Sequence, residues 1–437
     1  MIMSSVGLSS GLPEIICQLS PQSTPPSPTI DRDSIKCSKS KLVLHFDVNE
    51  TILIGDDAGG DTVEDCLNKI IAKSAFVKCP PDDSSSQTEG CVITTTTHYE
   101  TSHWWNGAPI MNDQKVHQPP SPLYTGWQWP QHCCPYYRTK FKKYAKTFTL
   151  EQQHGSAYRP LYELLKNSFL QLPSNAIGGG ANSNTDIESE DDSSLPPSHL
   201  FYRMLPSFFH TLVKLQEMNK DYTLVLRTFG DDLEDVALAI KDFAQGKHPV
   251  YPSFREPKLL LEECNMYRGR YRVEQPINGD DHGDGNRNSI INSIYDLFDW
   301  NDSSKVIASG DDELLNIIEG QSICGIQDDY KYWSGNDCVP SSGKPVWIHP
   351  KDEDGRVSYH HLIFDDNIHN DAKDSIVAVR SRDMHTRQWK SLSGENTIDQ
   401  QGIYVVRVPT VAAILEQDWF LQQIAVAEAR LHGHCTD

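Results

Sequence analysis

Three short apolar runs, each followed by a polar residue, constrain the fold of this chain most strongly. The runs and their following residues are Leu42–Phe46 with Asp47, Tyr222–Arg227 with Thr228, and His361–Phe364 with Asp365 and Asp366. Near-continuous apolar runs of this length are typical of parallel strands that are buried on both faces of a sheet. Helical patterns alternate with the runs, and this alternation predicts an α/β fold with a doubly wound, mostly parallel sheet.

Hydrophobic periodicity predicts the elements between and after these runs. The predicted helices cover 61–76, 201–217, 232–243 and a C-terminal stretch from Thr410 to Trp419. Thr410 is expected to cap the last of them, because its side chain can accept a backbone hydrogen bond at a helix start. Two further strands are predicted over 376–379 and 404–408.

The polar residues that follow the three strands are expected to meet in space. In an open α/β sheet the carboxyl ends of neighbouring parallel strands converge on one crevice, which would bring together Asp47, Thr228, Asp365 and Asp366. Carboxylates that meet repel one another unless a cation neutralises them. Oxygen ligands without clustered cysteine or histidine favour Mg²⁺. One aspartate after a strand is often only a turn or helix-cap residue, so the prediction depends on the whole set.

Four segments resemble the motifs of the haloacid dehalogenase-like superfamily, and they occur in the family order. They are His45–Thr51, an apolar strand followed by a variant of Asp-x-Asp-x-Thr; Leu224–Thr228, a strand that ends in Thr; Gly343–Pro345, which contains a motif lysine; and Leu362–Asp366 with Asp371, a strand that ends in acids. The segments bracket residues 41–380. The resemblance therefore covers most of the chain.

This resemblance implies a three-layer, Rossmann-like fold and a Mg²⁺-dependent phosphohydrolase or phosphotransferase for a small phosphorylated substrate. Asp47 would attack the phosphorus atom and form an aspartyl-phosphate. Mg²⁺ would be held by Asp47, by the backbone carbonyl of Asn49, and by Asp365 or Asp366.

The same resemblance implies roles for a threonine and a lysine. Thr228 would donate a hydrogen bond to a phosphoryl oxygen, and Lys344 would add positive charge beside the nucleophile. Lys305 and Lys331 are alternatives for that lysine, although Lys344 has the best position in the sequence.

Asn49 departs from the family pattern, in which an aspartate at this position acts as general acid and base. An amide cannot transfer that proton, and such catalysis contributes about 10²–10⁴ in rate. Three explanations stay open: a substrate with a good leaving group, a proton supplied by Glu50 or His369, or a non-catalytic protein that binds phosphate and Mg²⁺. A haloacid dehalogenase-type hydrolase is a fourth, but the pair Asp365–Asp366 favours metal and phosphorus.

Composition shifts along the chain predict its domain organisation. A core formed by 41–60 and 200–437 would hold a cap-like insertion over 61–199. A Ser/Pro-rich stretch at 1–40, a low-complexity linker at about 176–198 and a flexible insertion at 276–289 are expected to be disordered. The cap-like insertion at 61–199 also carries many aromatic residues and then a run of lysines. This pattern indicates either a binding surface or a small aromatic core with a solvated basic face.

Charge and cysteine usage narrow the choice of partners. The 437-residue chain carries a net charge of −21, and an acidic chain lacks the broad basic surface that attracts nucleic acid or anionic membranes. No apolar run approaches the roughly 18 residues that span a bilayer. The eleven cysteines form no CxxC pair, which is typical of reduced thiols, and we expect a cytoplasmic location.

Overall fold

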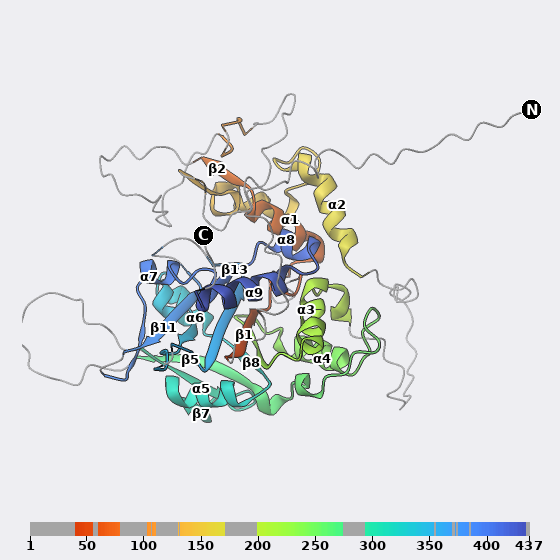
Figure 1. Ribbon diagram of the computed structural model, residues 1–437. Helices are drawn as coiled ribbons and strands as arrows, with labels where there is room; N and C mark the ends of the chain where they lie inside the picture. Colours follow the sequence, from red (N-terminus) through yellow and green to blue (C-terminus); the bar gives the residue numbers. More distant parts are fainter. Residues whose placement is uncertain are drawn as a thin grey trace, which may run out of the picture.

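Strand β1 (Lys41–Asp47) lies in the interior of an eight-stranded sheet (Figure 1). Its register pairs Phe46 with Phe364 of β10 (Tyr359–Asp365), and β4 (Tyr222–Thr228) lies on its other side. Both pairings are parallel. The three apolar runs of the sequence therefore form three adjacent strands whose carboxyl ends lie at one edge of the sheet.

The structure is a computed structural model that describes most of the chain. The described residues are 40–55, 60–78, 103–105, 107–110, 130, 132–170, 199–273, 293–353, 355–368, 372, 375–383 and 386–433. The predictions of disorder over 1–40, apart from Ser40, and over 176–198 and 276–289 lie outside these residues.

The complete sheet has the strand order β13-β10-β1-β4-β8-β5-β6-β7. Its other strands are β5 (Met266–Val273), β6 (Ser293–Asp299), β7 (Val306–Ser309), β8 (Ile323–Gln327) and β13 (Val405–Arg407). The strands from β13 to β5 pair in parallel, and β6 and β7 extend the sheet with antiparallel pairing. The predicted mixed α/β fold with a large, mostly parallel sheet is confirmed.

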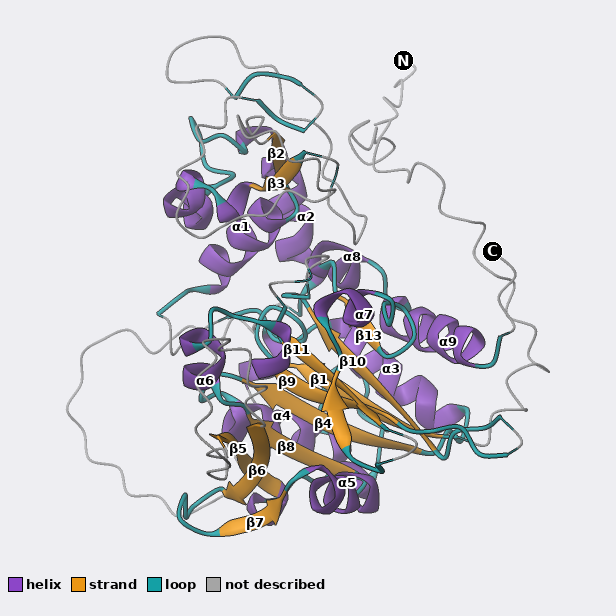
Figure 2. Ribbon diagram, turned by 90° about the vertical axis from the view of Figure 1, so that its left-hand side faces the viewer, coloured by secondary structure: helices purple, strands orange, loops and turns teal. Residues whose placement is uncertain are grey.

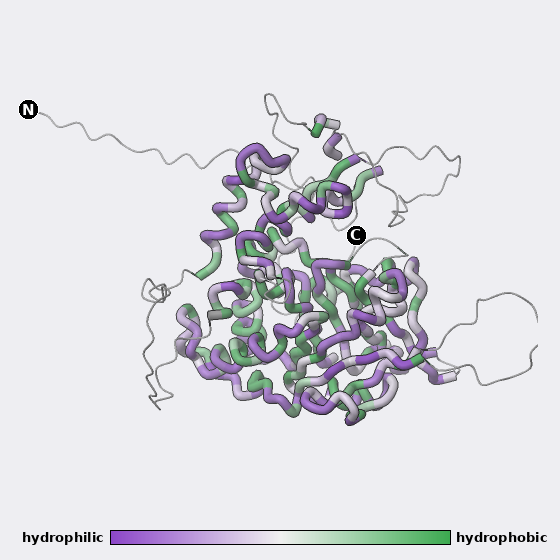
Figure 3. The backbone as a smooth tube through the Cα atoms, turned by 180° about the vertical axis from the view of Figure 1, so that it is seen from behind, coloured by the Kyte–Doolittle hydropathy of each residue, from purple (hydrophilic) through white to green (hydrophobic). Residues whose placement is uncertain are grey.

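One face of the sheet is covered by helices and holds the largest hydrophobic cluster. The covering helices are α3 (Pro206–Glu217), α4 (Leu233–Ala244) and α9 (Trp419–Leu431). The rings of Phe46, Phe208, Phe364 and Phe420 pack with centroid distances between 4.8 and 5.4 Å. The apolar segments gather inside the body that contains the sheet, as the hydropathy colouring shows (Figure 3).

The opposite face is covered by α5 (Asp311–Gly320) and by a small second sheet. The second sheet has the order β12-β11-β9 and consists of β9 (Lys344–Ile348), β11 (Val377–Arg382) and β12 (Trp389–Ser391). Because strand residues alternate between faces, His45, Arg227 and His361 share this face with Val43 and Val225. All five side chains are buried, so this layer contains a polar network as well as apolar packing.

Two predicted elements differ from the structure in detail. The strand predicted over 376–379 forms β11, which lies in the small sheet and not in the large one. The C-terminal helix is two helices, α8 (Thr410–Leu415) and α9, since Glu416 adopts an extended conformation between them. Thr410 does not cap: its hydroxyl donates to the carbonyl oxygen of Glu50 at 2.7 Å and so ties α8 to the loop after β1.

Between β1 and α3 the chain forms a group of short elements beyond the carboxyl edge of the sheet (Figure 2). They are α1 (Val63–Lys73), β2 (Phe76–Lys78), β3 (Cys133–Pro135), η3 (Tyr136–Arg138), η4 (Lys140–Thr147), η5 (Ser156–Tyr158) and α2 (Arg159–Ser168). Stacked rings of Trp104, Tyr136 and Phe141 form a small aromatic core here, and Lys140, Lys142 and Lys143 are exposed. That the segment 61–199 acts as a cap stays a prediction.

The remaining short elements connect the larger ones. They are η7 (His199–Tyr202), η8 (Pro257–Leu259), η9 (Glu263–Asn265), α6 (Tyr330–Gly335), η10 (Pro340–Ser342) and α7 (Gly394–Ile398). Within the part of the chain that the structure describes, no helix combines the length and the apolar character needed to cross a membrane.

Candidate active site

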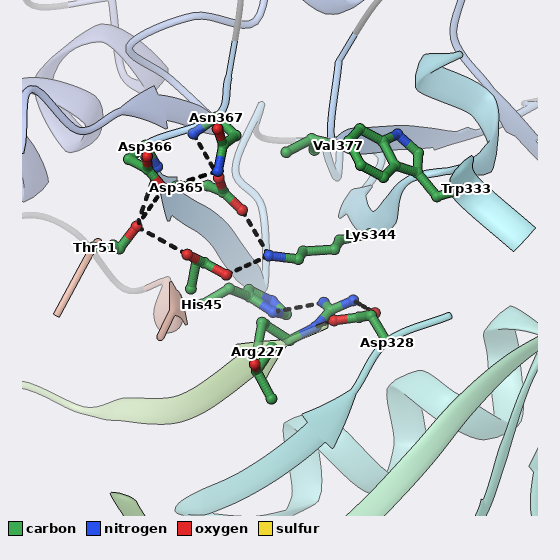
Figure 4. Close-up of polar contacts among 12 residues, drawn as sticks. His45, Thr51, Arg227, Asp328, Trp333, Lys344, Asp365, Asp366, Asn367 and Val377 are labelled. Carbon is green, nitrogen blue, oxygen red and sulfur yellow. Dashed lines mark hydrogen bonds and ion pairs between the residues drawn. The ribbon is translucent and has the colours of Figure 1, made fainter. Parts of the chain in front are cut away.

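Three carboxylates converge at the carboxyl edge of the large sheet. Asp47 is the last residue of β1, Asp365 is the last residue of the neighbouring β10, and Asp366 follows directly. Oxygen atoms of all three side chains lie within 4.8 Å of one another, and all three residues are buried. The parallel register explains the convergence, because it aligns the ends of β1 and β10. Figure 4 shows Asp365 and Asp366 in this cluster.

Lys344 reaches the cluster from the small sheet. Its ammonium group is almost fully buried, contacts Asp47 Oδ1, and lies 2.7 Å from Asp365 Oδ2 (Figure 4). Of the two alternative lysines, Lys305 pairs with Asp299 and Lys331 is exposed. The structure therefore places Lys344, at the start of β9, between the two carboxylates.

A buried arginine holds the start of β9 in place. Arg227 Nη1 donates to the carbonyl oxygen of Pro345 at 3.0 Å, directly after Lys344. The guanidinium is fixed in turn by Asp328, whose carboxylate accepts from Nε at 2.9 Å and from Nη2 at 2.5 Å. Tyr295 donates a further hydrogen bond to Asp328 at 2.5 Å. Because the buried guanidinium is held by Asp328 and by the Pro345 carbonyl, it is suited to hold the chain next to Lys344 in place.

Thr51 connects the two halves of the acidic cluster. Its hydroxyl lies 3.0 Å from Asp47 Oδ2 and 3.4 Å from Asp366 Oδ1, and it also accepts a hydrogen bond from the Asp366 backbone N–H at 3.1 Å. The backbone N–H of Asn367 donates a hydrogen bond to Asp365 at 2.8 Å, and its side-chain amide donates one to Asp366 at 3.0 Å. These contacts fix the orientation of the carboxylates with little freedom.

A lysine from the segment inserted after β1 also enters the cluster. Lys73, in the last turn of α1, lies 2.7 Å from Asp366 Oδ2 and also pairs with Glu50. Lys69, one turn earlier, pairs with Glu50 at 2.6 Å and with Asp61 at 2.9 Å. The inserted segment is therefore bound to the edge of the sheet by charged contacts.

Glu50 is unsuited to donate a proton in this arrangement. Burial raises the pKa of its carboxyl, but Lys73 and then Lys69 lower it by more, so that the net pKa lies below the ordinary value. The residue also has a positive φ of 60°, and its backbone N–H donates to Leu53. His369, the other proton donor considered from the sequence, and Asp371 lie outside the described residues.

Asn49 contacts the carboxylate of Asp232, which was not predicted from the sequence as part of the site. Its side-chain amide donates to Asp232 Oδ2 at 2.9 Å, while the buried Asn49 Oδ1 has no hydrogen-bond partner among the described residues. Thr228 Oγ1 accepts a hydrogen bond from the backbone N–H of Gly230 at 2.8 Å. A Cβ on Gly230 would lie 2.6 Å from Asp232 Oδ2, 3.2 Å from Asn49 Nδ2 and 3.4 Å from Thr228 Oγ1. The three polar groups thus gather around one glycine.

Burial and mutual repulsion disfavour the ionised form of the clustered carboxyls. Burial raises the pKa of Asp47 well above its ordinary value, the charge of Asp365 raises it further, and Lys344 opposes both effects. Burial likewise raises the pKa of Asp366 to about 6, although Lys73 lowers it. Lys344 keeps its proton, because Asp365 and Asp47 raise its pKa against the effect of burial.

The donor set fits a hard divalent cation. Among the described residues, the three carboxylates pair with two ammonium groups, those of Lys344 and Lys73, so one negative charge is left over within this set when all are ionised. Carboxylate oxygens in a buried cluster are the ligands that Mg²⁺ takes. The expected contribution of the Asn49 backbone carbonyl stays a prediction.

Sequence reasoning located most of this site but missed two of its groups. Asp47, Asp365, Asp366 and Lys344 come together as expected. The role of Lys73 could not be predicted, because a basic residue is common in the last turn of an amphipathic helix. Asp232 could have been noticed, because it follows the Thr228 strand end by only four positions and precedes α4.

Comparison with known proteins identifies no relative. No family model matches the chain, and neither a search of curated proteins nor one of solved structures gives a match.

Proposed function

We propose that this protein catalyses Mg²⁺-dependent phosphoryl transfer through an aspartyl-phosphate on Asp47, as the motif resemblance to haloacid dehalogenase-like proteins implies. The observation that carries the proposal is the convergence of Asp47, Asp365 and Asp366 within 4.8 Å, with Lys344 between the first two. A strand-end carboxylate held by a lysine, with two further acids beside it, is suited to attack an electrophilic phosphorus atom.

The residues of the chain prepare Asp47 for this attack. Lys344 contacts one carboxylate oxygen of Asp47, and the Thr51 hydroxyl donates to the other. The Asp47 side chain is therefore held in one orientation before substrate arrives. Lys344 and the Thr228 hydroxyl would stabilise negative charge that develops on the phosphoryl oxygens. Bound Mg²⁺ would neutralise the carboxylates and the phosphoryl group together, with Asp47, Asp365 and Asp366 as its ligands.

Asp232 is the described residue best placed to supply the proton that Asn49 cannot. Its Oδ2 atom lies 2.9 Å from the Asn49 amide, next to the side-chain position where the family has its acid. In this proposal Asp232 protonates the leaving group and then removes a proton from the attacking water, which are the two steps of general acid–base catalysis.

A non-catalytic phosphate- and Mg²⁺-binding protein is the second candidate. The amide of Asn49 supports it, because Asn49 itself has no proton to transfer. The pairing of Lys73 with Asp366 supports it too, since an ammonium group already compensates one of the acids.

An activity assay separates the candidates. Purified protein would be tested with p-nitrophenyl phosphate, an acyl phosphate and a halogenated acid, with Mg²⁺ or with EDTA. Phosphate release that needs Mg²⁺ and is lost in Asp47→Asn supports the proposal. Asp242→Asn is the matched control, because this carboxylate lies on α4 in a pair with exposed Lys247. Mg²⁺ binding without any turnover supports the second candidate, and metal-independent halide release contradicts both.

A further inference from the structure

A second group of metal-ligand side chains lies away from the acidic cluster. Glu319 is near the end of α5, His349 follows β9, and His361 lies within β10. His361 precedes Asp365 by four residues on the same strand, and four residues of a strand span about 13 Å. The proposed phosphoryl transfer uses none of the three.

The geometry of this group is convergent. Nε2 of His349 lies 2.6 Å from Glu319 Oε1, and Nε2 of His361 lies 3.1 Å from the same oxygen. The two imidazole rings stack with centroids 5.4 Å apart at an interplanar angle of 24°. One ligand atom from each residue lies within 4.8 Å of the others. The two imidazole nitrogen atoms thus converge on one carboxylate oxygen, and all three residues offer a ligand atom within a small volume.

The surroundings orient these ligands. The side chain of His361 has no exposed surface, whereas those of Glu319 and His349 are 11 % and 18 % exposed, which leaves one side open to solvent. His361 Nδ1 lies 3.0 Å from Nε2 of His45, which is itself buried in β1. This contact holds the orientation of the His361 ring, as outer partners do for ligating imidazoles.

We propose that Glu319, His349 and His361 bind a divalent transition metal, with Zn²⁺ as the natural occupant and solvent in the fourth position. Two imidazole nitrogens and one carboxylate form a ligand set that zinc takes with an open coordination site. Mg²⁺ prefers all-oxygen surroundings, so the two sites of this chain differ in the metal that they select.

Metal binding has a consequence for the hydrogen bonds behind the site. In the metal-free protein Arg227 Nη1 donates to His45 Nδ1 at 3.3 Å, and His45 Nε2 can then donate to His361 Nδ1. A metal bound to His361 Nε2 would leave the ring proton of His361 on Nδ1. His45 Nε2 would then accept a hydrogen bond from His361 Nδ1, and His45 would carry its own proton on Nδ1. The Arg227–His45 contact is then lost, while Arg227 keeps its bonds to Asp328 and Pro345.

Zinc titration of the full-length protein tests the proposal. Zn²⁺ would be titrated against a chromophoric chelator in the presence of excess Mg²⁺, which keeps the acidic cluster occupied. We expect His349→Ala and Glu319→Gln each to lose one equivalent of bound Zn²⁺, or to bind it more weakly by over 100-fold, since loss of an outer-shell partner alone costs about 10–100-fold. His210→Ala is the matched control, because His210 pairs with a single carboxylate, that of Asp418, at 2.9 Å.

The wild-type protein supplies a second readout that does not depend on the folding of a variant. Co²⁺ in place of Zn²⁺ should give the intense visible absorption of a four-coordinate site, and added Zn²⁺ should abolish it. Equal zinc stoichiometry and affinity in the wild type and both ligand variants would overturn the proposal. So would a cobalt spectrum with only the weak bands of a six-coordinate ion, and the three side chains would then be a hydrogen-bonded cluster alone.

Discussion

Asn49 and Asp232 form an amide–carboxylate pair beside Thr228, and the identity of each partner depends on the other. The Asn49 amide donates to Asp232 Oδ2 at 2.9 Å. A carboxylate in place of the amide would bring two negative charges into contact in a site with little solvent, which is destabilising unless one of them is protonated. The pair therefore explains how an asparagine is accommodated where the motif usually has an acid.

Exchanging the two residues tests this pairing. We expect Asn49→Asp to lower the thermal unfolding temperature without gain in alkyl phosphatase rate, because the two carboxylates repel one another. The double variant Asn49→Asp/Asp232→Asn should recover stability, with a coupling free energy of about 1–3 kcal/mol in a double-mutant cycle. Its rate with alkyl phosphates should match or exceed that of the wild type. Additive effects of the two substitutions would show that the pair is not coupled.

In the proposed Mg²⁺ site, Lys73 would compete with the metal ion for Asp366. Its Nζ lies 2.7 Å from Asp366 Oδ2, and removal of that charge should strengthen the attraction of the cluster for cations. We predict that Lys73→Met tightens Mg²⁺ binding by about tenfold in isothermal titration, as expected for the loss of one nearby charge at a partly solvated site.

Lys142→Met is the control for the Lys73 variant. Lys142 lies 5.0 Å from the Tyr137 ring centroid, and Lys73 lies 5.5 Å from the same centroid, but Lys142 is exposed. Its loss should leave Mg²⁺ affinity unchanged. Weaker Mg²⁺ binding in Lys73→Met would mean that the lysine organises the ligands and does not compete with the metal.

At the level of elements, the sequence predicted the strands with near-continuous buried runs at the site, but it missed β5 and the short strand β8. β1, β4 and β10 carry continuous apolar runs and were recognised. β5 has the sequence MYRGRYRV, in which arginines alternate with other residues, and it pairs with β8 and β6 only through long-range contacts. Such pairing is not visible in local periodicity.

The same limit applies to the candidate site. Residues at strand ends could be placed together because the sheet topology brings those ends to one edge. Lys73 and Asp232 come from helix ends, and their contacts depend on how α1 and α4 dock against the sheet. A helix pattern gives the buried side of a helix but not its position along a neighbouring element.

His248 makes the packing of α3 and α4 sensitive to acid. Its ring lies among Phe201, Phe209 and Phe243, with centroid distances from 4.6 to 5.6 Å. Burial lowers the pKa of His248 to about 4. Nδ1 accepts a hydrogen bond from the backbone N–H of Val250 at 3.2 Å, so protonation there would remove a bond as well as bury a charge.

This arrangement predicts a specific pH dependence of stability. Because the pKa in the folded state lies below the ordinary value near 6.5, the stabilisation by neutral His248 is complete above pH 6.5 and is lost as the pH falls toward 4. Between pH 7 and pH 4 the unfolding free energy of the wild type should fall by up to about 3 kcal/mol more than that of His248→Leu, as measured in urea titrations. Phe254→Leu, in the same aromatic core, should not change the pH slope. Equal slopes for His248→Leu and the wild type would contradict the prediction.

At the level of the whole molecule, the segment inserted after β1 is joined to the sheet by charged contacts. The carboxylate of Glu50 forms ion pairs with both Lys69 and Lys73 of α1, and Lys73 also pairs with Asp366. This connects the position of the inserted segment to the charge state of the acidic cluster. If a cation or substrate binds at the sheet edge as proposed, it would change the docking of α1 through these contacts.

Hydrogen–deuterium exchange tests this connection. We predict that Glu50→Gln increases exchange of the α1 backbone amides while β1 stays protected, because the helix loses its charged attachment and the sheet does not. Glu64→Gln is the control, since Glu64 lies on the same helix in an exposed pair with Lys166. Unchanged exchange of α1 in Glu50→Gln would show that other contacts hold the segment.

The most direct test of the account is to trap phosphate on Asp47. The protein would be incubated with acetyl phosphate and Mg²⁺, quenched in acid, digested and analysed by mass spectrometry. We predict a phosphoryl group on the peptide that contains Asp47, at that residue, dependent on Mg²⁺ and absent from the Asp47→Asn and Asp365→Asn variants. Label on another residue, or label that forms equally well in EDTA, would contradict the assignment of Asp47 as the nucleophile of a Mg²⁺ site.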